Sequence, residues 1–425
     1  MATKSYEHHF SSANLPFGIG SSAPTHEKPQ AATRIDDSVI FLNDLAEDGL
    51  FSGIEGLPHG VFALDTLNEF AALPREVHQQ VRRALQAALE DGGLSRFPDK
   101  SVESVSKVAM HMPVRVGDFS DFSCSLDHVQ NAGRIATGKI GAPPAFAHHP
   151  IGYQGRASSI VVSGTPIPRP KGHFPTAGEV VFSPSTAVDY ELEFAAVMGK
   201  PLPWGEQLSA AAAEDHIFGY VLLNDWSARD IQVFEMPPLG PFIGKNFGTT
   251  ISPWVITPDA LSPFKTSPPS PAQPTSKHLK VDPLSTYDIQ TTAEIITEDT
   301  RTVTCTSKLA ELHWTLPQAI AHLVSGGCGL RTGDIVATGT ISGHQTGQYG
   351  CLLESTEGGR KPIVLKDGSA RSYLKDGDTV EISAVAGGED SGVGFGCCSG
   401  RLVGSKLTPP HACKVLLQAA LEVAL

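Results

Sequence analysis

The sequence predicts a mainly β fold with a few connecting helices. Glycine and proline are abundant, with 42 and 32 among 425 residues, and only 18% of the residues are charged. Chains rich in turns and poor in charged helical surface favour sheets. Short apolar runs that end at turn residues, such as 218–223 and 379–385, have the pattern of strands. A hydrophobic fraction of 40% and a mean hydropathy of −0.06 indicate a soluble globular protein, and the length suits two or three structural units.

Residues 1–113 are predicted to form a separate N-terminal unit with a small β portion and one helix. A tight turn leading into a strand over 34–42 supplies the β portion. The helix is predicted over 74–91, because apolar residues recur at every fourth position, Pro74 suits a first helical turn, and Gly92-Gly93 follow the last one. This unit carries no evident chemistry, so we expect it to serve packing, dimer contacts or one wall of a pocket.

Residues 114–425 are predicted to form the second unit. Strands are expected at 159–162, 179–198, 218–223, 334–340 and 379–385. Short helices are expected at 209–216, with Ser209 as N-cap, and from Thr315 to Val324. The passage from His128 to Pro150 is rich in glycine and proline, and six prolines within 262–283 predict a surface loop inside this unit.

Charge, cysteines and hydropathy bound the partners and the compartment. The net charge of −13 argues against a nucleic-acid partner, since phosphate binding needs clustered Lys and Arg. The seven cysteines show no zinc-site spacing, and their odd number suits a reducing compartment. The N-terminus is polar, and no run of 18 apolar residues is present. We therefore expect a cytoplasmic enzyme that binds neither nucleic acid nor a membrane.

Three carboxylates lie in otherwise apolar strand sequence. Glu191 and Glu193 are two residues apart, so in a strand they share one face, and Asp225 ends an apolar run. Such carboxylates are costly to bury unless they share a cation or a proton, so a bound metal is the first hypothesis. The alternatives are a solvated strand face for the two glutamates and a helix N-cap for Asp225.

Three further residues could stabilise a developing oxyanion. Arg229 and Gln232 lie on one face if a helix begins near Asp225, and Lys245 is a single lysine in an apolar, glycine-rich segment. The alternative for Arg229 is a salt bridge back to Asp225. His128 is one of 16 histidines, and position alone does not select it. Without a convincing nucleophile, a metal with a general base acting on water is the favoured chemistry.

Six ordered motifs carry a resemblance to a known family. They are 117–122, 152–159, 191–193, 224–232 (Asn-Asp-Trp-Ser-Ala-Arg-Asp-Ile-Gln), 238–245 and 338–343. Together they resemble the fumarylacetoacetase family, which is named for the last enzyme of tyrosine catabolism. The match runs through most of 111–404 and reappears at 14–18, which implies a shared two-domain layout.

The resemblance implies an N-terminal SH3-like barrel, a C-terminal mixed β-sandwich roll and a homodimer. It implies a divalent cation, Mg²⁺ or Ca²⁺, held by Asp121, Glu191, Glu193 and Asp225, with Lys245 and Thr249 at the same site; oxygen ligands suit a hard cation. By the same resemblance His128 is the base on water and Glu354 orients its imidazole. Arg229, Gln232 and Lys245 then stabilise the alkoxide before the carbon–carbon bond of a β-diketone breaks. Tyr153, Thr249 and Thr340 match positions that line the site.

The sequence departs from the family at three substrate-binding positions. Ser123 and Met236 replace tyrosines, and Thr137 replaces an arginine, although Arg134 and Lys139 lie close by. Each charge-assisted hydrogen bond is worth about 1.5–3 kcal/mol, so these changes should weaken binding of a fumaryl dicarboxylate by several kcal/mol in sum. They favour a different, bulkier or less acidic diketone.

The sequence therefore predicts a fumarylacetoacetase-like hydrolase, and two alternatives stay open. The first is another enolate reaction on the same platform: decarboxylation, tautomerisation, dehydration or cyclisation, none of which needs His128 to activate water. The second is a non-catalytic binding protein, which retention of all four carboxylates disfavours.

Overall fold

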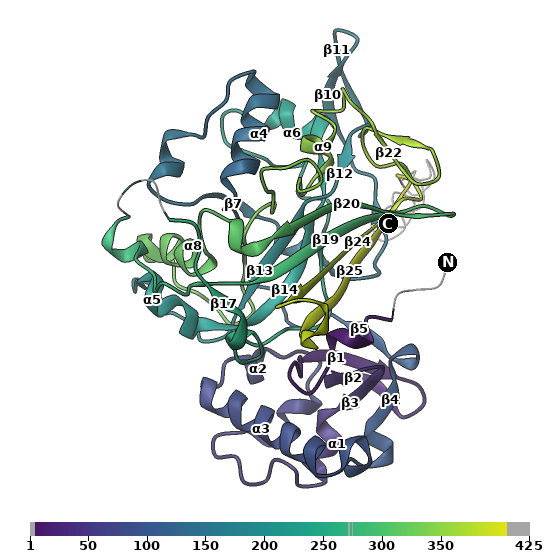
Figure 1. The fold of residues 1–425 in the computed structure, drawn as a ribbon, viewed down its shortest axis with the longest axis vertical. Coiled ribbons are helices and arrows are strands. Elements are labelled where there is room, and N and C mark those ends of the chain that lie inside the picture. The colour runs from purple at the N-terminus through teal and green to yellow at the C-terminus, as the bar shows by residue number, and fades with distance from the viewer. Residues whose placement is uncertain (1–4, 271–272, 274, 406–425) are drawn as a thin grey trace, which may run out of the picture.

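The structure is a computed structural model that describes residues 5–270, 273 and 275–405. The end of the predicted second unit, 406–425, and three positions of the predicted loop 262–283 lie outside the described residues. Figure 1 shows a smaller N-terminal unit, in purple and blue, beneath a larger unit built around long strands. The predicted mainly β fold is confirmed.

The N-terminal unit is an antiparallel five-stranded sheet in the order β4-β3-β2-β1-β5, covered by helices. Its strands are β1 (Gly18–Ser22), β2 (His26–Ile35), β3 (Ser38–Phe41), β4 (Val102–Ser104) and β5 (Ala109–His111). Its helices are α1 (Leu42–Glu47), α2 (Asn68–Ala71) and α3 (Arg75–Gly92). The predicted turn into a strand and the predicted amphipathic helix are both confirmed: Val77, Val81 and Leu85 of α3 are buried.

A mixed seven-stranded sheet forms the centre of the molecule, in the order β7-β6-β21-β13-β14-β16-β8. Its strands are β6 (Phe119–Ser123), β7 (Ile151–Gly155), β8 (Ile160–Val162), β13 (Leu192–Met198), β14 (Ile217–Asp225), β16 (Thr249–Ile251) and β21 (Ile335–Ala337). The pair β6–β21 and the pair β8–β16 are parallel, whereas the other pairs are antiparallel.

Both faces of this central sheet are covered, which explains its nearly continuous apolar strands. Every residue of β13 and β14 is buried. Along β13, Phe194 and Ala196 belong to the core shared with the second sheet, whereas Ala195 and Val197 belong to the core beneath the N-terminal unit. A carboxylate on either strand is therefore held away from bulk water.

The second sheet of the sandwich has the order β20-β19-β24-β25-β9. Its strands are β9 (Ile167–Pro168), β19 (Ile289–Ile296), β20 (Arg301–Lys308), β24 (Thr379–Ala386) and β25 (Gly394–Val403). It packs on the central sheet through β24 and β25 against β14. Four two-stranded pairs complete the β structure: β10 (Lys171–Thr176) with β11 (Glu179–Pro184), which projects at the top of Figure 1, β12 (Val188–Asp189) with β15 (Ser227–Ala228), β17 (Lys265–Thr266) with β18 (Thr286–Tyr287), and β22 (Ile363–Val364) with β23 (Ala370–Arg371).

The connecting helices partly follow the sequence predictions. They are α4 (Leu126–Thr137), α5 (Ala210–Ala213), α6 (Arg229–Glu235), α7 (Pro258–Leu261), α8 (Leu316–Leu323) and α9 (Leu352–Ser355). The helix after Thr315 is confirmed, with a capping box between Thr315 and Gln318. Ser209 holds the predicted N-cap position of α5, but its side chain makes no capping hydrogen bond.

Two predictions about element boundaries were wrong. The strand expected over 334–340 is only Ile335–Ala337, because Gly339, at φ +70°, turns the chain away from the sheet. The passage from His128 onward lies at first in the unpredicted helix α4, which begins at Leu126 and whose N-cap Ser125 accepts a hydrogen bond from the His128 backbone N–H. The glycines and prolines that follow are typical of a loop, so this cap and the first turn of the helix were not predicted.

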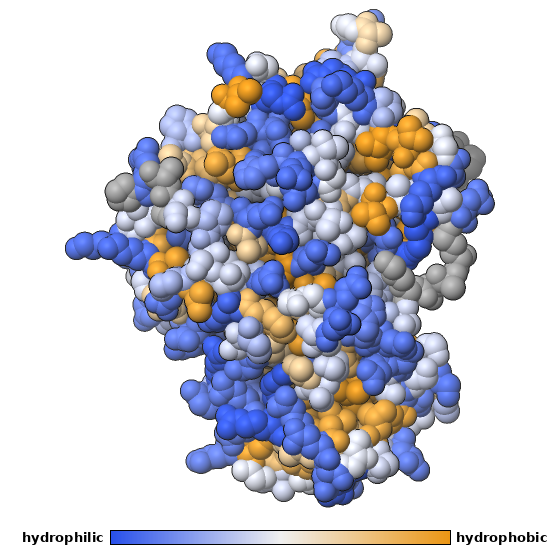
Figure 2. Space-filling view, viewed as in Figure 1, coloured by the Kyte–Doolittle hydropathy of each residue, from blue (hydrophilic) through white to orange (hydrophobic). Residues whose placement is uncertain are grey.

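The surface is mostly hydrophilic on the face that Figure 2 shows, with separate hydrophobic patches. The exposed large apolar side chains include Val233 and Phe234 near the end of α6 and a run after it: Met236, Leu239, Phe242 and Ile243. None of the helices within the described residues is long and apolar enough to cross a membrane.

Candidate active site

The strand register of the central sheet brings the predicted site residues to one edge. Asp121 of β6 pairs with Tyr153 of β7 on one side and with Ala337 of β21 on the other. Asp225, the last residue of β14, pairs with Thr249, the first residue of β16. Residues far apart in the chain thus meet because their strands end together.

These side chains also share one face of the sheet. Glu193 follows the same alternation as Ala195 and Val197, which lie in the core beneath the N-terminal unit. The same two-residue spacing relates Asp121 to Phe119, Asp225 to Leu223 and Thr249 to Ile251, and these three apolar residues belong to that core. The N-terminal unit therefore covers the apolar part of this face, and the polar part lies just beyond it.

Four carboxylates meet at this edge: Asp121, Glu191, Glu193 and Asp225. Each is buried and offers an oxygen, and these four oxygens lie within 4.8 Å of one another. Among the described residues, no donor reaches either oxygen of Glu193 or Oδ1 of Asp121. Buried oxygens that no residue in the described part of the chain satisfies, in an all-oxygen set, fit a hard divalent cation.

Mutual repulsion and burial perturb the pKa values of this cluster. Burial, followed by the charges of Asp121 and Asp225, raises the pKa of Glu193 well above its ordinary value. Burial and the charges of Asp225 and Glu191 do the same to the pKa of Asp121. Both shifts favour the protonated form of these two carboxyls, and a bound cation would favour the ionised form.

Lys245 supplies one positive charge to the cluster. Its Nζ donates to Asp225 Oδ2 at 2.7 Å and also to Glu191. Burial alone would lower the pKa of Lys245, but the charges of Asp225 and Glu191 raise it above its ordinary value. Because an ammonium has no lone pair to offer, Lys245 lies at the predicted metal site as a counter-charge to two of the carboxylates.

Arg229 supplies the second positive charge from the first residue of α6. Its guanidinium pairs with Glu191 Oε1 and with Asp189 Oδ2, each at 2.9 Å. Burial alone would raise the pKa of Glu191, but the charges of Lys245 and Arg229 outweigh that effect and lower it. Counting Asp189, five buried carboxyl groups face two cations, so three negative charges would be uncompensated if all five groups were ionised.

The geometry excludes three alternatives that the sequence left open. Asp225 ends β14 and does not cap a helix, because α6 starts at Arg229 with Ala228 as N-cap. Arg229 does not pair back to Asp225 but bridges Asp189 and Glu191. The two glutamates are buried and do not lie on a solvated strand face. The predicted shared face of Arg229 and Gln232 is present, with Nη1 3.1 Å from Gln232 Oε1.

His128 and Glu354 form the second part of the site. His128 Nδ1 lies 2.8 Å from Glu354 Oε2, between helices α4 and α9, which pack together. Burial alone would raise the pKa of Glu354, but His128 lowers it, so the carboxyl is ionised and accepts the Nδ1 proton. The Nε2 lone pair is then free to act as a base. When protonated, His128 would also lower the pKa of Glu191, so the two parts of the site are neighbours.

The remaining predicted residues differ in how close they come to the carboxylates. Tyr153 donates its hydroxyl to Asp225 Oδ2 at 2.5 Å, and Thr249 donates to Asp225 Oδ1 at 3.1 Å. Thr340 is buried with a hydroxyl that no described residue satisfies. Thr137 is exposed at the end of α4, and its hydroxyl donates to the Gly133 carbonyl in its own helix.

The other two positions lie at the margins of the site. Ser123 is half-buried at the end of β6, two residues beyond Asp121, and Met236 is exposed just after α6. Neither position presents a charged group.

Three residues that hold the site in place were not among the residues predicted from the sequence. Asn131 donates to Glu354 Oε1 at 3.0 Å, and Ser342 donates to Glu354 Oε2 at 2.7 Å. Asp189 accepts hydrogen bonds from Arg229 and from the backbone of α9. Asn131 follows His128 by three residues, so recognising the helix would have placed both on one face. Ser342 and Asp189 carry no comparable local signal.

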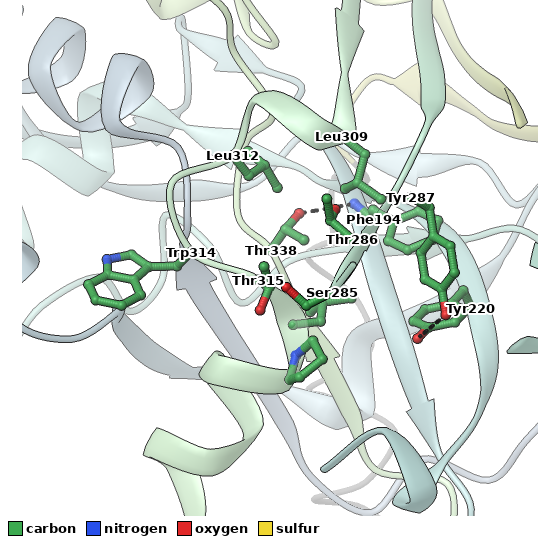
Figure 3. Close-up of a pocket in the computed structure, with 12 residues that line it drawn as sticks. Phe194, Tyr220, Ser285, Thr286, Tyr287, Leu309, Leu312, Trp314, Thr315 and Thr338 are labelled. Atoms are coloured by element: carbon green, nitrogen blue, oxygen red, sulfur yellow. Dashed lines mark hydrogen bonds between the residues drawn. The ribbon is translucent and has the colours of Figure 1, made fainter. Parts of the chain in front are cut away.

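An internal cavity of about 20 Å³ lies elsewhere in the sandwich (Figure 3). Phe194 lines it, and Glu193 on the same strand points to the opposite face. In Figure 3 the Tyr220 and Tyr287 hydroxyls meet at 3.3 Å, and Thr338 Oγ1 accepts from the Phe194 N–H at 3.2 Å. The unpaired Ser285 hydroxyl also faces this space, which has room for one water molecule. None of the predicted site residues lines this cavity.

Comparisons with known proteins identify the family of this chain. The family model "Fumarylacetoacetate (FAA) hydrolase C-terminal" matches residues 119–403, and "Fumarylacetoacetase N-terminal" matches residues 13–113. Fumarylacetoacetase from Arabidopsis thaliana is 42% identical over 407 residues, covering 93% of this chain and 96% of that protein. Fumarylacetoacetase fahA from Aspergillus fumigatus is 44% identical over 416 residues, covering 93% of this chain and 96% of that protein. Fumarylacetoacetase from Rattus norvegicus is 39% identical over 401 residues, covering 92% of this chain and 95% of that protein.

Solved structures share the fold at low identity. The crystal structure of Cg1458 with inhibitor has a TM-score of 0.52 at 15% identity, and the fumarylacetoacetate hydrolase of psychrophilic Exiguobacterium antarcticum has 0.50 at 16%. Each comparison covers 92% of this chain and 100% of the other. The full-length relatives and both family models, taken with the site geometry, lead to one conclusion: the chain belongs to the fumarylacetoacetase family and is a hydrolase that acts on carbon–carbon bonds.

Proposed function

We propose that the chain hydrolyses the carbon–carbon bond of a β-diketone with the help of a divalent cation, Mg²⁺ or Ca²⁺. The observation that carries this proposal is the buried carboxylate cluster with unsatisfied Glu193 oxygens, next to a histidine whose Nδ1 proton is fixed by Glu354. Such a site combines electrostatic stabilisation of an enolate with a base for water, and hydrolysis of a diketone needs both.

The base in this proposal is His128. Glu354 accepts the Nδ1 proton, while Asn131 and Ser342 hold the two carboxylate oxygens from other directions. The imidazole is thereby kept in one tautomer with Nε2 as acceptor. Nε2 takes a proton from water as the oxygen adds to the substrate carbonyl, and returns it to the carbon that leaves as an enolate.

The donors for the developing alkoxide are Gln232 and Lys245. Arg229 Nη1 donates to Gln232 Oε1, which fixes the amide oxygen, and no described residue accepts from the Gln232 amide nitrogen. Two of the three Lys245 N–H groups are occupied by Glu191 and Asp225, which leaves one for substrate. The Arg229 guanidinium is already engaged by carboxylates, so it acts mainly by holding Gln232 and Glu191.

Asp121, Glu191, Glu193 and Asp225 would hold the cation. Bound there, it would supply Lewis-acid stabilisation of the enolate oxygens that form as the carbon–carbon bond breaks. Thr249 and Tyr153 hold the Asp225 carboxylate, and Lys245 holds both Glu191 and Asp225. These contacts fix the ligand oxygens before any ion arrives.

We further propose that the preferred substrate is a less acidic or bulkier diketone than fumarylacetoacetate. Ser123, Thr137 and Met236 offer no cationic group, and the Thr137 hydroxyl is already bonded within its own helix. The names of the relatives make fumarylacetoacetate the reference compound. A direct comparison of kcat/KM for fumarylacetoacetate and for an uncharged acyl β-diketone, read from loss of diketone absorbance, tests this. Higher kcat/KM with fumarylacetoacetate would contradict it.

A cytoplasmic homodimer is also proposed for the chain. The apolar run after α6, with Leu239 96% exposed and Phe242 64% exposed, supports self-association, because scattered single apolar residues need no partner but a clustered run does. Sedimentation of the purified chain at micromolar concentration should give twice the 44.9 kDa monomer mass. A monomer at that concentration would contradict the proposal.

Hydrolysis is distinguished from another enolate reaction by His128. His128→Ala removes the base for water and should abolish hydrolysis, whereas decarboxylation or tautomerisation does not require water activation. Full turnover of the physiological substrate by this variant would contradict the hydrolase proposal. A calorimetric titration that detects no divalent-cation binding would instead support a binding protein.

A further inference from the structure

Asp189 occupies a position between the two halves of the site. It is completely buried on the short strand β12, whose partner β15 leads directly into Arg229 of α6. On its other side lies the turn that begins α9 and carries Glu354. Asp189 belongs neither to the carboxylate cluster nor to the base, and the proposed chemistry leaves it unused.

Each oxygen of Asp189 accepts from two donors. Oδ1 accepts from the backbone N–H groups of Leu352 at 2.7 Å and Tyr190 at 2.8 Å. Oδ2 accepts from the backbone N–H of Leu353 at 2.8 Å and from Arg229 Nε at 2.9 Å. The carboxylate therefore links the guanidinium that orients Gln232 to the two residues that immediately precede Glu354.

We propose that Asp189 is a positioning residue that holds the Arg229 guanidinium and the Glu354-bearing turn in one fixed arrangement. The inference rests on the proposed function, because Asp189 sets the position of the base relative to the alkoxide donors. On one side it fixes Arg229, and through Arg229 the Gln232 amide. On the other side it satisfies the first two N–H groups of α9, so Glu354 meets His128 at a defined angle.

Asparagine tests this arrangement without changing the size of the side chain. Whichever way the amide is turned, its N–H₂ group faces two N–H donors of the protein, because both carboxylate oxygens are fully used. One side of the junction must therefore shift. Small displacements of catalytic groups cost about a hundredfold in rate.

A matched control is available in Asp378, which is also buried. Asp378 accepts from Arg371 Nε and Nη2 at 2.8 and 2.9 Å and from the Lys375 backbone N–H at 2.8 Å. It makes the same kinds of bond as Asp189 but contacts none of the proposed catalytic groups. Asp378→Asn should lower stability and leave kcat and KM for the diketone unchanged.

The experiment compares wild type, Asp189→Asn and Asp378→Asn by two readouts. The first is steady-state hydrolysis of fumarylacetoacetate with saturating Mg²⁺, where Asp189→Asn should lower kcat about a hundredfold while KM changes less than about threefold. The second is the downfield proton resonance of His128 Nδ1–H, recorded without substrate and assigned by its loss in His128→Ala. Asp189→Asn should shift or broaden it, and Asp378→Asn should not.

The outcomes separate this inference from the proposed function. Wild-type kcat and an unshifted His128 resonance in Asp189→Asn would overturn the inference. If the wild type hydrolyses no diketone, the proposed function fails, and the resonance still decides whether Asp189 positions the His128–Glu354 pair. If Asp189→Asn does not fold, the smaller Asp189→Ser, which keeps one acceptor oxygen, takes its place. Failure of both to fold while Asp378→Asn folds would also overturn the inference, because Asp189 would then serve folding.

Discussion

Replacing Glu193 by glutamine removes one charge from the carboxylate cluster while keeping the side chain's size. The ligand oxygens of the cluster lie within 4.8 Å of one another, and two unit charges at that distance interact by about 3.5 kcal/mol at an effective dielectric constant of about 20. Each ionised neighbour therefore opposes the charge on Glu193 by at least about that much, and no donor in the described part of the chain offsets it directly. In the absence of a cation, neutral glutamine should replace protonated glutamate at little cost.

The expected result is opposite in sign to the usual effect of removing a buried carboxylate. In chelator, the free energy of unfolding of Glu193→Gln should equal that of wild type within about 1 kcal/mol, or exceed it. With Mg²⁺ at a hundred times its Kd, wild type should gain about 2.7 kcal/mol. If loss of one ligand weakens binding a hundredfold, the variant should gain only about 0.4 kcal/mol at the same concentration. Urea denaturation with chelator and with Mg²⁺ measures all four values.

Glu381→Gln is the matched control. Glu381 accepts from Arg301 at 2.8 and 2.6 Å and from the Tyr6 hydroxyl at 2.8 Å, so its charge is well partnered. Its replacement should lose about 1–3 kcal/mol, equally in chelator and in Mg²⁺. The reasoning about the cluster would be refuted if Glu193→Gln lost that much in chelator, or if it kept the full stabilisation by Mg²⁺.

Three further predictions follow from named contacts. His128→Ala should lower kcat for diketone hydrolysis by about 10²–10⁴-fold, and Glu354→Gln should lower kcat more than it raises KM. Near wild-type kcat for His128→Ala in the absorbance assay would show that His128 is not the base. Gly339→Ala should lower the free energy of unfolding in urea by about 3 kcal/mol or more, because a Cβ there would meet the Phe122 carbonyl oxygen at 1.8 Å with φ at +70°. The control Gly347→Ala, with φ +89° and open space around it, should cost about 1 kcal/mol. Equal losses for the two variants would contradict the steric argument. Burial lowers the pKa of His78, so below pH of about 6.5 the unfolded chain takes up a proton that the folded chain does not bind. The free energy of unfolding should therefore fall with decreasing pH by up to about 1.4 kcal/mol per pH unit from this group. His78→Gln should flatten that part of the stability–pH curve, and an unchanged slope would exclude the contribution.

Much of the architecture could be predicted because local chemistry specifies it. The helix α3 has a proline before its first turn, an apolar stripe and a terminal glycine, and each signal lies within a few residues of the element. A continuous apolar run predicts the strand β14, and the structure explains this run by burial on both faces of the sheet. The helix α4 was missed because its single capping serine is followed by an amphipathic stretch only 12 residues long and then by glycines and prolines.

The site was predictable as a set of residue types, but its internal contacts depend on strand register. Nothing local to Asp121 shows that it faces Glu193, because the two strands lie on either side of β21. Asp225 looked equally suited to capping a helix until the pairing of β14 with β16 placed it beside Thr249. Asp189 could not be selected at all, since its donors come from α6 and from a turn more than 160 residues away.

The most direct test of the central claim is hydrolysis of a β-diketone by the chelator-treated chain before and after a divalent cation is restored. Fumarylacetoacetate serves as the reference substrate, and loss of its diketone absorbance is the signal. The account predicts no turnover in chelator, recovery on addition of Mg²⁺ or Ca²⁺, and no recovery in Glu193→Gln at the same concentration. Equal turnover in chelator and in Mg²⁺ would contradict a carboxylate cluster that works by holding a cation.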